Sequence, residues 1–125
     1  FKIGKIYFKK KNYHKAANFF SKAIEYNNKN YLHFHYRGLS YLKARKYKKA
    51  IADFNKSIAL NRNYFHSWHM GAVAFMAINK IELSKKYYYN AEKFGHINLP
   101  GFSVFRKTWK FLDSTPTVSR KLKGN

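Results

Sequence analysis

The sequence contains no cysteine, which excludes disulfide bonds and thiolate metal sites. Its longest apolar run, Met70 to Ile78, is far too short to cross a bilayer, and no secretory signal peptide is visible. These absences favour an intracellular location without fixing a compartment. Paired carboxylates, a glycine-rich phosphate loop and a nucleophile–base set are also missing, and Asp and Glu total only five. We therefore expect no enzymatic activity, no cofactor and no bound metal.

The scarcity of acidic residues leaves a formal net charge of +21, because Lys and Arg total 26. A charge of this size predicts a polyanionic partner, such as a nucleic acid, an acidic protein segment or an anionic membrane. A second explanation is the codon bias of an AT-rich genome, which favours Lys over Arg. That bias does not account for the low number of Asp and Glu residues, so both explanations stay open.

The chain does contain a pattern that recurs every 34 residues. Three positions of the pattern hold small residues, and two hold aromatic residues. Small side chains let two helix backbones approach closely, and aromatic rings fill the space around such a contact. The recurring sets are Gly4/Gly38/Ala72, Ala16/Ala50/Ser84, Ala23/Ser57/Ala91, Tyr7/Tyr41/Phe75 and Phe20/Phe54/Tyr88.

This pattern resembles the tetratricopeptide repeat, a helix–turn–helix unit of about 34 residues. The resemblance covers residues 1–98 and implies an all-α solenoid of three repeats, at 1–30 (with a truncated start), 31–64 and 65–98. Because the chain begins inside the first helix, we expect it to be part of a longer protein or assembly. Four residues depart from the family by standing where apolar residues are usual: Arg37, Gly71, Lys85 and Glu92. We expect helices near 1–9, 13–27, 31–43, 47–60, 65–77 and 81–94.

Beyond the repeats, Pro100 and Gly101 mark a break. Apolar residues then recur at spacings of three and four, which predicts an amphipathic helix. We interpret residues 99–113 as a capping helix that covers the open end of the array, with a partner-binding helix as the alternative. Residues 114–125 lack apolar periodicity, and we expect a flexible basic tail.

In this family the first helix of each repeat lines a concave groove. Several members bind an acidic tail there, through a two-carboxylate clamp of Lys, Asn and Arg. At the matching places this chain has Phe1, Lys5, Tyr36, His66 and Met70, so we expect no such clamp. We favour a polar groove lining over a zinc site for the histidines, since no carboxylate is placed to support them. By resemblance, the groove residues are Lys5, Lys9, His35, Tyr36, Leu39, Lys43, His66, His69, Met70 and Val73.

Basic residues gather at the turn inside each repeat and just after it. Stacking the repeats places these turns along one edge, where the side chains form a positive strip. Such a strip would follow a phosphate backbone or an acidic segment without reading bases, and a plain solvated surface is the alternative. We call these residues the basic ridge: Lys10, Lys11, Lys15, Arg45, Lys46, Lys48, Lys49 and Lys80.

The sequence therefore predicts a non-enzymatic protein–protein interaction or scaffold module. Its groove, with apolar anchors among histidines, is expected to bind a segment of a partner, and the basic ridge predicts that the partner is acidic. The alternative is an RNA-associated subunit of a ribonucleoprotein assembly, held by the ridge and the tail.

Overall fold

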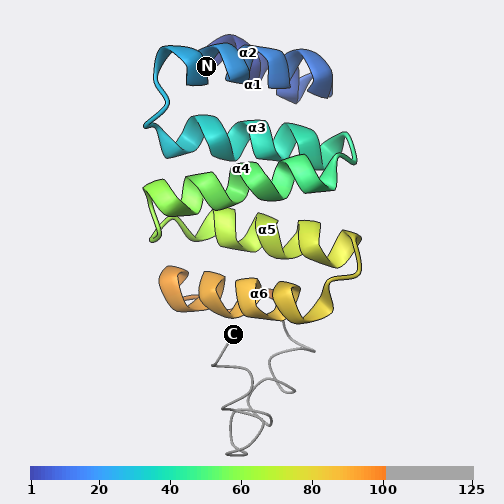
Figure 1. Ribbon diagram of the computed structural model, residues 1–125, viewed down its shortest axis with the longest axis vertical. Helices are drawn as coiled ribbons and strands as arrows, with labels where there is room; N and C mark the ends of the chain where they lie inside the picture. The colour runs from blue at the N-terminus through green and yellow to red at the C-terminus, as the bar shows by residue number, and fades with distance from the viewer. Residues whose placement is uncertain (101–125) are drawn as a thin grey trace, which may run out of the picture.

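Six α-helices make up the part of the chain that this computed structural model describes, residues 1–100, and no strand occurs there. Figure 1 shows them stacked in chain order. The expectation of an all-α solenoid is confirmed, and each expected helix end lies within one residue of the observed one. The expected capping helix lies almost entirely outside the described residues, and the basic tail wholly outside them. The helices are α1 (Lys2–Lys9), α2 (Tyr13–Tyr26), α3 (Tyr31–Lys43), α4 (Tyr47–Leu60), α5 (Phe65–Ala77) and α6 (Ile81–Gly95).

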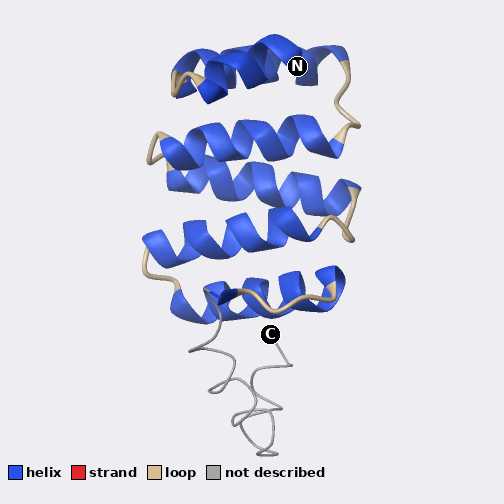
Figure 2. Ribbon diagram, turned by 180° about the vertical axis from the view of Figure 1, so that it is seen from behind, coloured by secondary structure: helices blue, strands red, loops and turns tan. Residues whose placement is uncertain are grey.

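Each helix packs against the next one along the chain, so the array consists of three helix pairs, α1–α2, α3–α4 and α5–α6. The turns within the pairs lie along one side of the molecule, and the connections between pairs lie along the other (Figure 2). We call α1, α3 and α5 the leading helices. No helix among residues 1–100 has the length and apolar character needed to span a membrane.

The turn inside each pair repeats its backbone conformation. Lys11, Arg45 and Asn79 stand 34 residues apart, and each has a φ of 62°, in the left-handed region. The next residue then donates its backbone N–H to a carbonyl five residues earlier, a bond that closes the end of the leading helix. These bonds are Asn12 N to Tyr7 O (2.9 Å), Lys46 N to Tyr41 O (2.8 Å) and Lys80 N to Phe75 O (2.9 Å).

Small residues permit the close packing inside each pair. A Cβ atom on Gly4 would lie 2.6 Å from the ring of Phe20, and one on Gly38 would lie 2.8 Å from the ring of Phe54. Both rings are completely buried. The third pair has Ala72 at the glycine position, where the backbone carbonyl accepts a hydrogen bond from the Ser84 hydroxyl (2.8 Å). The 34-residue pattern of small and aromatic residues thus forms the core.

The family departure at Arg37 is explained by a partly buried ion pair. Its guanidinium donates to both oxygens of Asp53, at 2.8 and 2.7 Å, and to the hydroxyl of Ser21, at 3.2 Å. Asp53 is 5% exposed. Burial raises the pKa of Asp53, and the hydrogen bonds and charge of Arg37 oppose this rise. The pair joins α3 to α4, with α2 supplying the third acceptor.

The other three residues that depart from the family pattern also make contacts that account for them. Gly71 leaves room for a ring of α6, since a Cβ there would lie 2.9 Å from Tyr87. Lys85 forms an ion pair with Glu82, at 3.4 Å. Glu92 accepts the backbone N–H of Leu99, at 2.6 Å. The small residue Gly71 and the charged residues Lys85 and Glu92 therefore fit the packing of the third pair, although the family usually has apolar residues at these positions.

Candidate functional site

The predicted groove residues all lie on the leading helices, and α3 contacts α5 directly as well as through α4. Three of the ten, Lys9, Lys43 and His66, are exposed. Six are half-buried, a state in which a side chain is fixed by neighbours and still offers surface to a partner. These six are Lys5, Tyr36, Leu39, His69, Met70 and Val73. His35 differs, because it is buried and offers almost no surface.

Lys5 is held between two aromatic rings. Its ammonium nitrogen lies 5.3 Å from the ring centre of Phe1 and 5.3 Å from that of Tyr36. The two rings meet edge to face, with centres 5.4 Å apart. A cation close to aromatic rings is attracted by their negative faces. At this end of the groove, the two leading helices α1 and α3 therefore present one cation in an aromatic setting.

His35 belongs to a buried chain of hydroxyl groups. Its Nδ1 lies 2.8 Å from the Ser67 hydroxyl, which lies 2.8 Å from the Ser57 hydroxyl. This chain links α3, α4 and α5 and places polar groups in the core with partners. Burial, followed by the charge of the nearby His66, lowers the pKa of His35 from 6.5 to about 4. His35 is therefore neutral at physiological pH.

The apolar groove residues divide between two clusters. Leu39 and Met70 pack on the same buried cluster as Phe54, so the structure brings these two together. Val73 packs on a different cluster, which includes Tyr88 of α6. His69 also faces Tyr88, with ring centres 5.7 Å apart, and burial, followed by the charge of His66, lowers its pKa.

The histidines do not gather into a ligand set. Among residues 1–100 no group of three or more His, Asp or Glu side chains is placed to hold a metal ion. His66 lies on the ring of Phe65, with centres 4.0 Å apart. His33 packs against Phe1, with centres 4.9 Å apart, and its Nδ1 is buried without a hydrogen bond.

The eight residues of the basic ridge are all exposed. Between the second and third helix pairs, four of them border an open pocket of about 450 Å³. Tyr47 and Ile78 complete its wall. The four cations are Arg45, Lys46, Lys48 and Lys49, and none of them has an ion pair within the described part of the chain.

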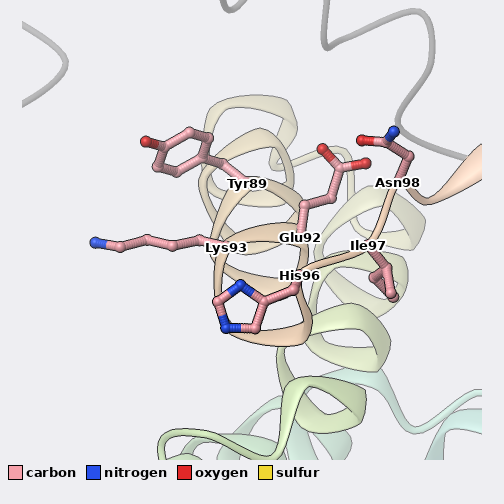
Figure 3. Close-up of a pocket in the computed structure, with 6 residues that line it drawn as sticks. All are labelled: Tyr89, Glu92, Lys93, His96, Ile97 and Asn98. Atoms are coloured by element: carbon pink, nitrogen blue, oxygen red, sulfur yellow. The ribbon is translucent and has the colours of Figure 1, made fainter.

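A further pocket, of about 470 Å³, lies at the end of α6 and contains none of the predicted site residues (Figure 3). Tyr89, Glu92 and Lys93 line it from the helix, and Figure 3 shows Glu92 beside Asn98. His96 ends the helix with a φ of 53°. Glu92 accepts the backbone N–H of Leu99, so it ties the chain that follows α6 back onto the helix.

The sequence did not reveal which aromatic residues surround the groove side chains. Phe1 was assigned only to a clamp position, and Tyr64, whose ring centre lies 5.0 Å from that of His35, was not assigned at all. Burial raises the pKa of Tyr64 to about 12, so its hydroxyl stays protonated. Tyr64 stands just before α5, and a position between repeats carries no helical signal that could have identified it.

Comparison with protein families gives two matches, both to the tetratricopeptide repeat. One covers residues 1–30 and the other residues 34–64. A comparison with curated proteins gives no significant match.

Solved structures with the same architecture include the first tetratricopeptide repeat domain of Spaghetti (RPAP3) bound to the HSP90 peptide SRMEEVD. It is 27% identical with a TM-score of 0.80, over 90% of each chain. The first such domain of human RPAP3 is 27% identical with a TM-score of 0.78, over 90% of this chain and 89% of that one. The TPR2B domain of yeast Sti1, in a complex with Hsp70, is 22% identical with a TM-score of 0.73, over 83% and 82%. This last likeness concerns the fold alone.

Proposed function

Because this chain carries a tetratricopeptide repeat segment, we propose that it is a non-enzymatic module that binds a segment of a partner protein along its leading helices. The half-buried groove side chains carry the proposal, since they come from three successive leading helices and keep surface free. A domain 27% identical to this chain binds the peptide SRMEEVD. That relationship supports a peptide as the ligand class.

The proposed peptide differs in chemistry from SRMEEVD, which has three acidic side chains. The positions that form a two-carboxylate clamp in the family hold Phe1, Lys5, Tyr36, His66 and Met70 here. Only one of these is a lysine, and its ammonium already lies against two rings. Half-buried apolar and aromatic side chains instead favour a segment with apolar anchors.

The basic ridge adds attraction for an acidic stretch of the same partner. Its side chains lie at the turns, on the edge of the array, so they can contact chain that continues beyond the groove. Exposed cations of this kind chiefly raise the association rate and depend on salt. We propose that the groove provides selectivity and the ridge provides long-range attraction.

The test is selection of peptides from a random display library, followed by calorimetry with the selected peptide and with SRMEEVD. Tyr36→Ala together with Met70→Ala is expected to weaken the selected peptide at least tenfold, because both remove anchor contacts. Tyr26→Ala is the matched control, since Tyr26 is 94% exposed at the far end of α2. Charge reversal at Lys10, Arg45 and Lys46 should slow association and leave dissociation nearly unchanged.

Equal binding by the groove double variant and by the parent would refute the groove as the site. Tight binding of SRMEEVD that is lost in Lys5→Ala would show that the carboxylate-tail chemistry is retained after all. An unchanged association rate in the charge-reversed variant would remove the ridge from the proposal.

A further inference from the structure

Four exposed lysines on α2 and α4 have their ammonium groups held over aromatic rings. In the first helix pair, Lys15 lies 5.4 Å from the ring centre of Tyr7, and Lys22 lies 5.2 Å from that of Phe19. Tyr7 and Phe19 stack on each other, with centres 5.4 Å apart and planes 5° from parallel. The first pair thus carries a continuous line of cation, ring, ring and cation.

The second pair repeats the two cations one period later. Lys49 lies 5.6 Å from the ring centre of Tyr41, and Lys56 lies 6.0 Å from that of Phe34. Arg37 joins the two rings, at 5.8 Å from each centre. We call Lys15, Lys22, Lys49 and Lys56 the lysine quartet. Two of its members also belong to the basic ridge, and the other two lie further along α2 and α4.

The third pair does not continue the quartet. The residues that follow Lys49 and Lys56 by one period are Leu83 and Asn90. Tyr87 occupies the corresponding surface of α6 and packs against Phe75, with ring centres 4.8 Å apart. The quartet pattern therefore ends with the second pair, and the ring-held cations of the third pair, Arg62 and Lys93, lie elsewhere, 5.4 and 5.6 Å from the ring centre of Phe94.

The four lysines of the quartet are not neutralised by acidic side chains of the described residues, and their contacts with the rings restrict their side-chain motion. None of its four ammonium groups has an ion pair among residues 1–100. A lysine that already rests on a ring loses less side-chain entropy when an anion binds than a lysine extended into water. The regular spacing of the four lysines, their unpaired charges and the restricted motion of their side chains together suit a ligand with repeated negative groups.

The chemistry of the surface distinguishes among polyanions. Lysine is a compact point charge that binds phosphate without demanding one orientation. Insertion into a membrane would need exposed apolar side chains, and the large exposed apolar residues of α2 and α4 stand only at the helix ends, at Tyr26 and Leu60. Cations interleaved with half-exposed rings are instead the arrangement that binds an unpaired nucleic acid strand.

We propose that the lysine quartet binds the phosphate backbone of single-stranded RNA. The half-exposed rings of Tyr7, Phe19 and Tyr41 lie between the cations, and since their faces carry cations or each other, it is their edges that the bases can contact. The hydroxyls of Tyr7 and Tyr41 form no hydrogen bond within the described residues, so they are available to a ribose 2′-hydroxyl. Binding is independent of base sequence, because no side chain here reads base edges. The surface is separate from the groove, and it shares only Lys15 and Lys49 with the basic ridge of the proposed peptide function.

The experiment measures binding of a fluorescein-labelled uridine oligonucleotide by anisotropy, over a series of salt concentrations. Changing the quartet to glutamine should weaken binding at least tenfold and reduce the log–log salt slope by up to about 3, at about 0.7 per phosphate contact. The control changes Lys2, Lys9, Lys29 and Lys43 to glutamine, which removes the same charge from exposed lysines that lie over no ring within residues 1–100. The control should lose less than threefold, and Tyr36→Ala should bind RNA like the parent.

A quartet of arginines keeps the charge and should keep the affinity within about threefold, so it remains informative if the glutamine variant does not fold. Equal losses in the quartet and control variants would overturn the proposal in favour of net charge alone. Tighter binding to a polyglutamate peptide, or to vesicles containing phosphatidylserine, would assign the surface to those partners. Equal affinity for the matching single-stranded DNA would overturn the choice of RNA.

Discussion

The chemistry of single residues in this protein is set by what burial does to polar groups. His35 is 4% exposed and its neutral ring is bonded to Ser67. Protonation would place a positive charge in the core beside a second histidine, which is why the pKa falls to about 4. The buried series of hydrogen bonds from His35 through Ser67 to Ser57 is therefore tolerated only while the imidazole stays neutral.

This arrangement predicts that acid destabilises the fold. Between pH 6.5 and about 4 the unfolded chain binds a proton at His35 and the folded chain does not, so the free energy of unfolding decreases as the pH falls. At about 1.4 kcal/mol per pH unit, the loss from pH 7 down to pH 4 amounts to about 3 kcal/mol. Urea titrations at several pH values measure it.

His35→Gln should flatten most of this dependence, leaving a smaller contribution from His69, whose pKa is also lowered. His14→Gln, an exposed histidine on α2, is the control and should keep the parent's dependence. A parent whose stability is the same at pH 7 and pH 5 would contradict the burial argument.

At the scale of helices, the sequence predicts where each helix begins and ends, but it does not predict which side chains contact one another between helices. The 34-residue pattern placed Tyr31, Lys43, Tyr47 and Leu60 correctly as helix ends, because periodicity and small residues report which faces pack. The pattern could not pair Arg37 with Asp53, sixteen residues away on another helix, since that depends on side-chain direction in three dimensions.

The candidate site was predictable only in outline. The leading helices were anticipated, and the ten residues expected to face the groove remain predictions as binding residues. The burial of His35 was not anticipated, because a histidine at a groove position looks the same in sequence whether it faces water or two serines. The contacts between lysines and rings likewise depend on side-chain conformations that residue spacing leaves open.

The left-handed residue in each turn leads to a prediction at this scale. Arg45 has a φ of 62°, which costs a residue with a Cβ about 1–2 kcal/mol and costs glycine little. Arg45→Gly should stabilise the protein by about 0.5–1 kcal/mol, after the greater freedom of glycine in the unfolded chain is deducted. The midpoint of urea unfolding measures this gain. Arg45→Ala, which keeps the Cβ, should give no gain, and a lower midpoint for glycine than for alanine would refute the explanation.

For the molecule as a whole, the dominant property is unbalanced charge. The net charge is +21, and the ion pairs among the described residues include Arg37 with Asp53 and Lys85 with Glu82. A compact chain with this charge repels itself, and salt weakens that repulsion.

We therefore expect the melting temperature to rise with salt. Going from about 0.01 M to about 0.1 M NaCl shortens the Debye length from about 30 to about 10 Å, and each kcal/mol of relieved repulsion raises the midpoint by roughly 4–8 °C. Scanning calorimetry measures the change. The variant with glutamine at the four quartet positions should show a smaller rise. A midpoint that falls with added salt would mean that attractive ion pairs outweigh the repulsion.

The pairing of Arg37 with Asp53 also distinguishes the second helix pair from the other two. The corresponding positions hold Ile3 with Phe19 in the first pair and Gly71 with Tyr87 in the third. Exchange of a leading helix between different pairs would leave a carboxylate buried without its cation or a ring without its space. The repeats resemble one another in backbone, yet they are not interchangeable parts. Mismatch at these positions therefore disfavours assembly of the repeats in the wrong order.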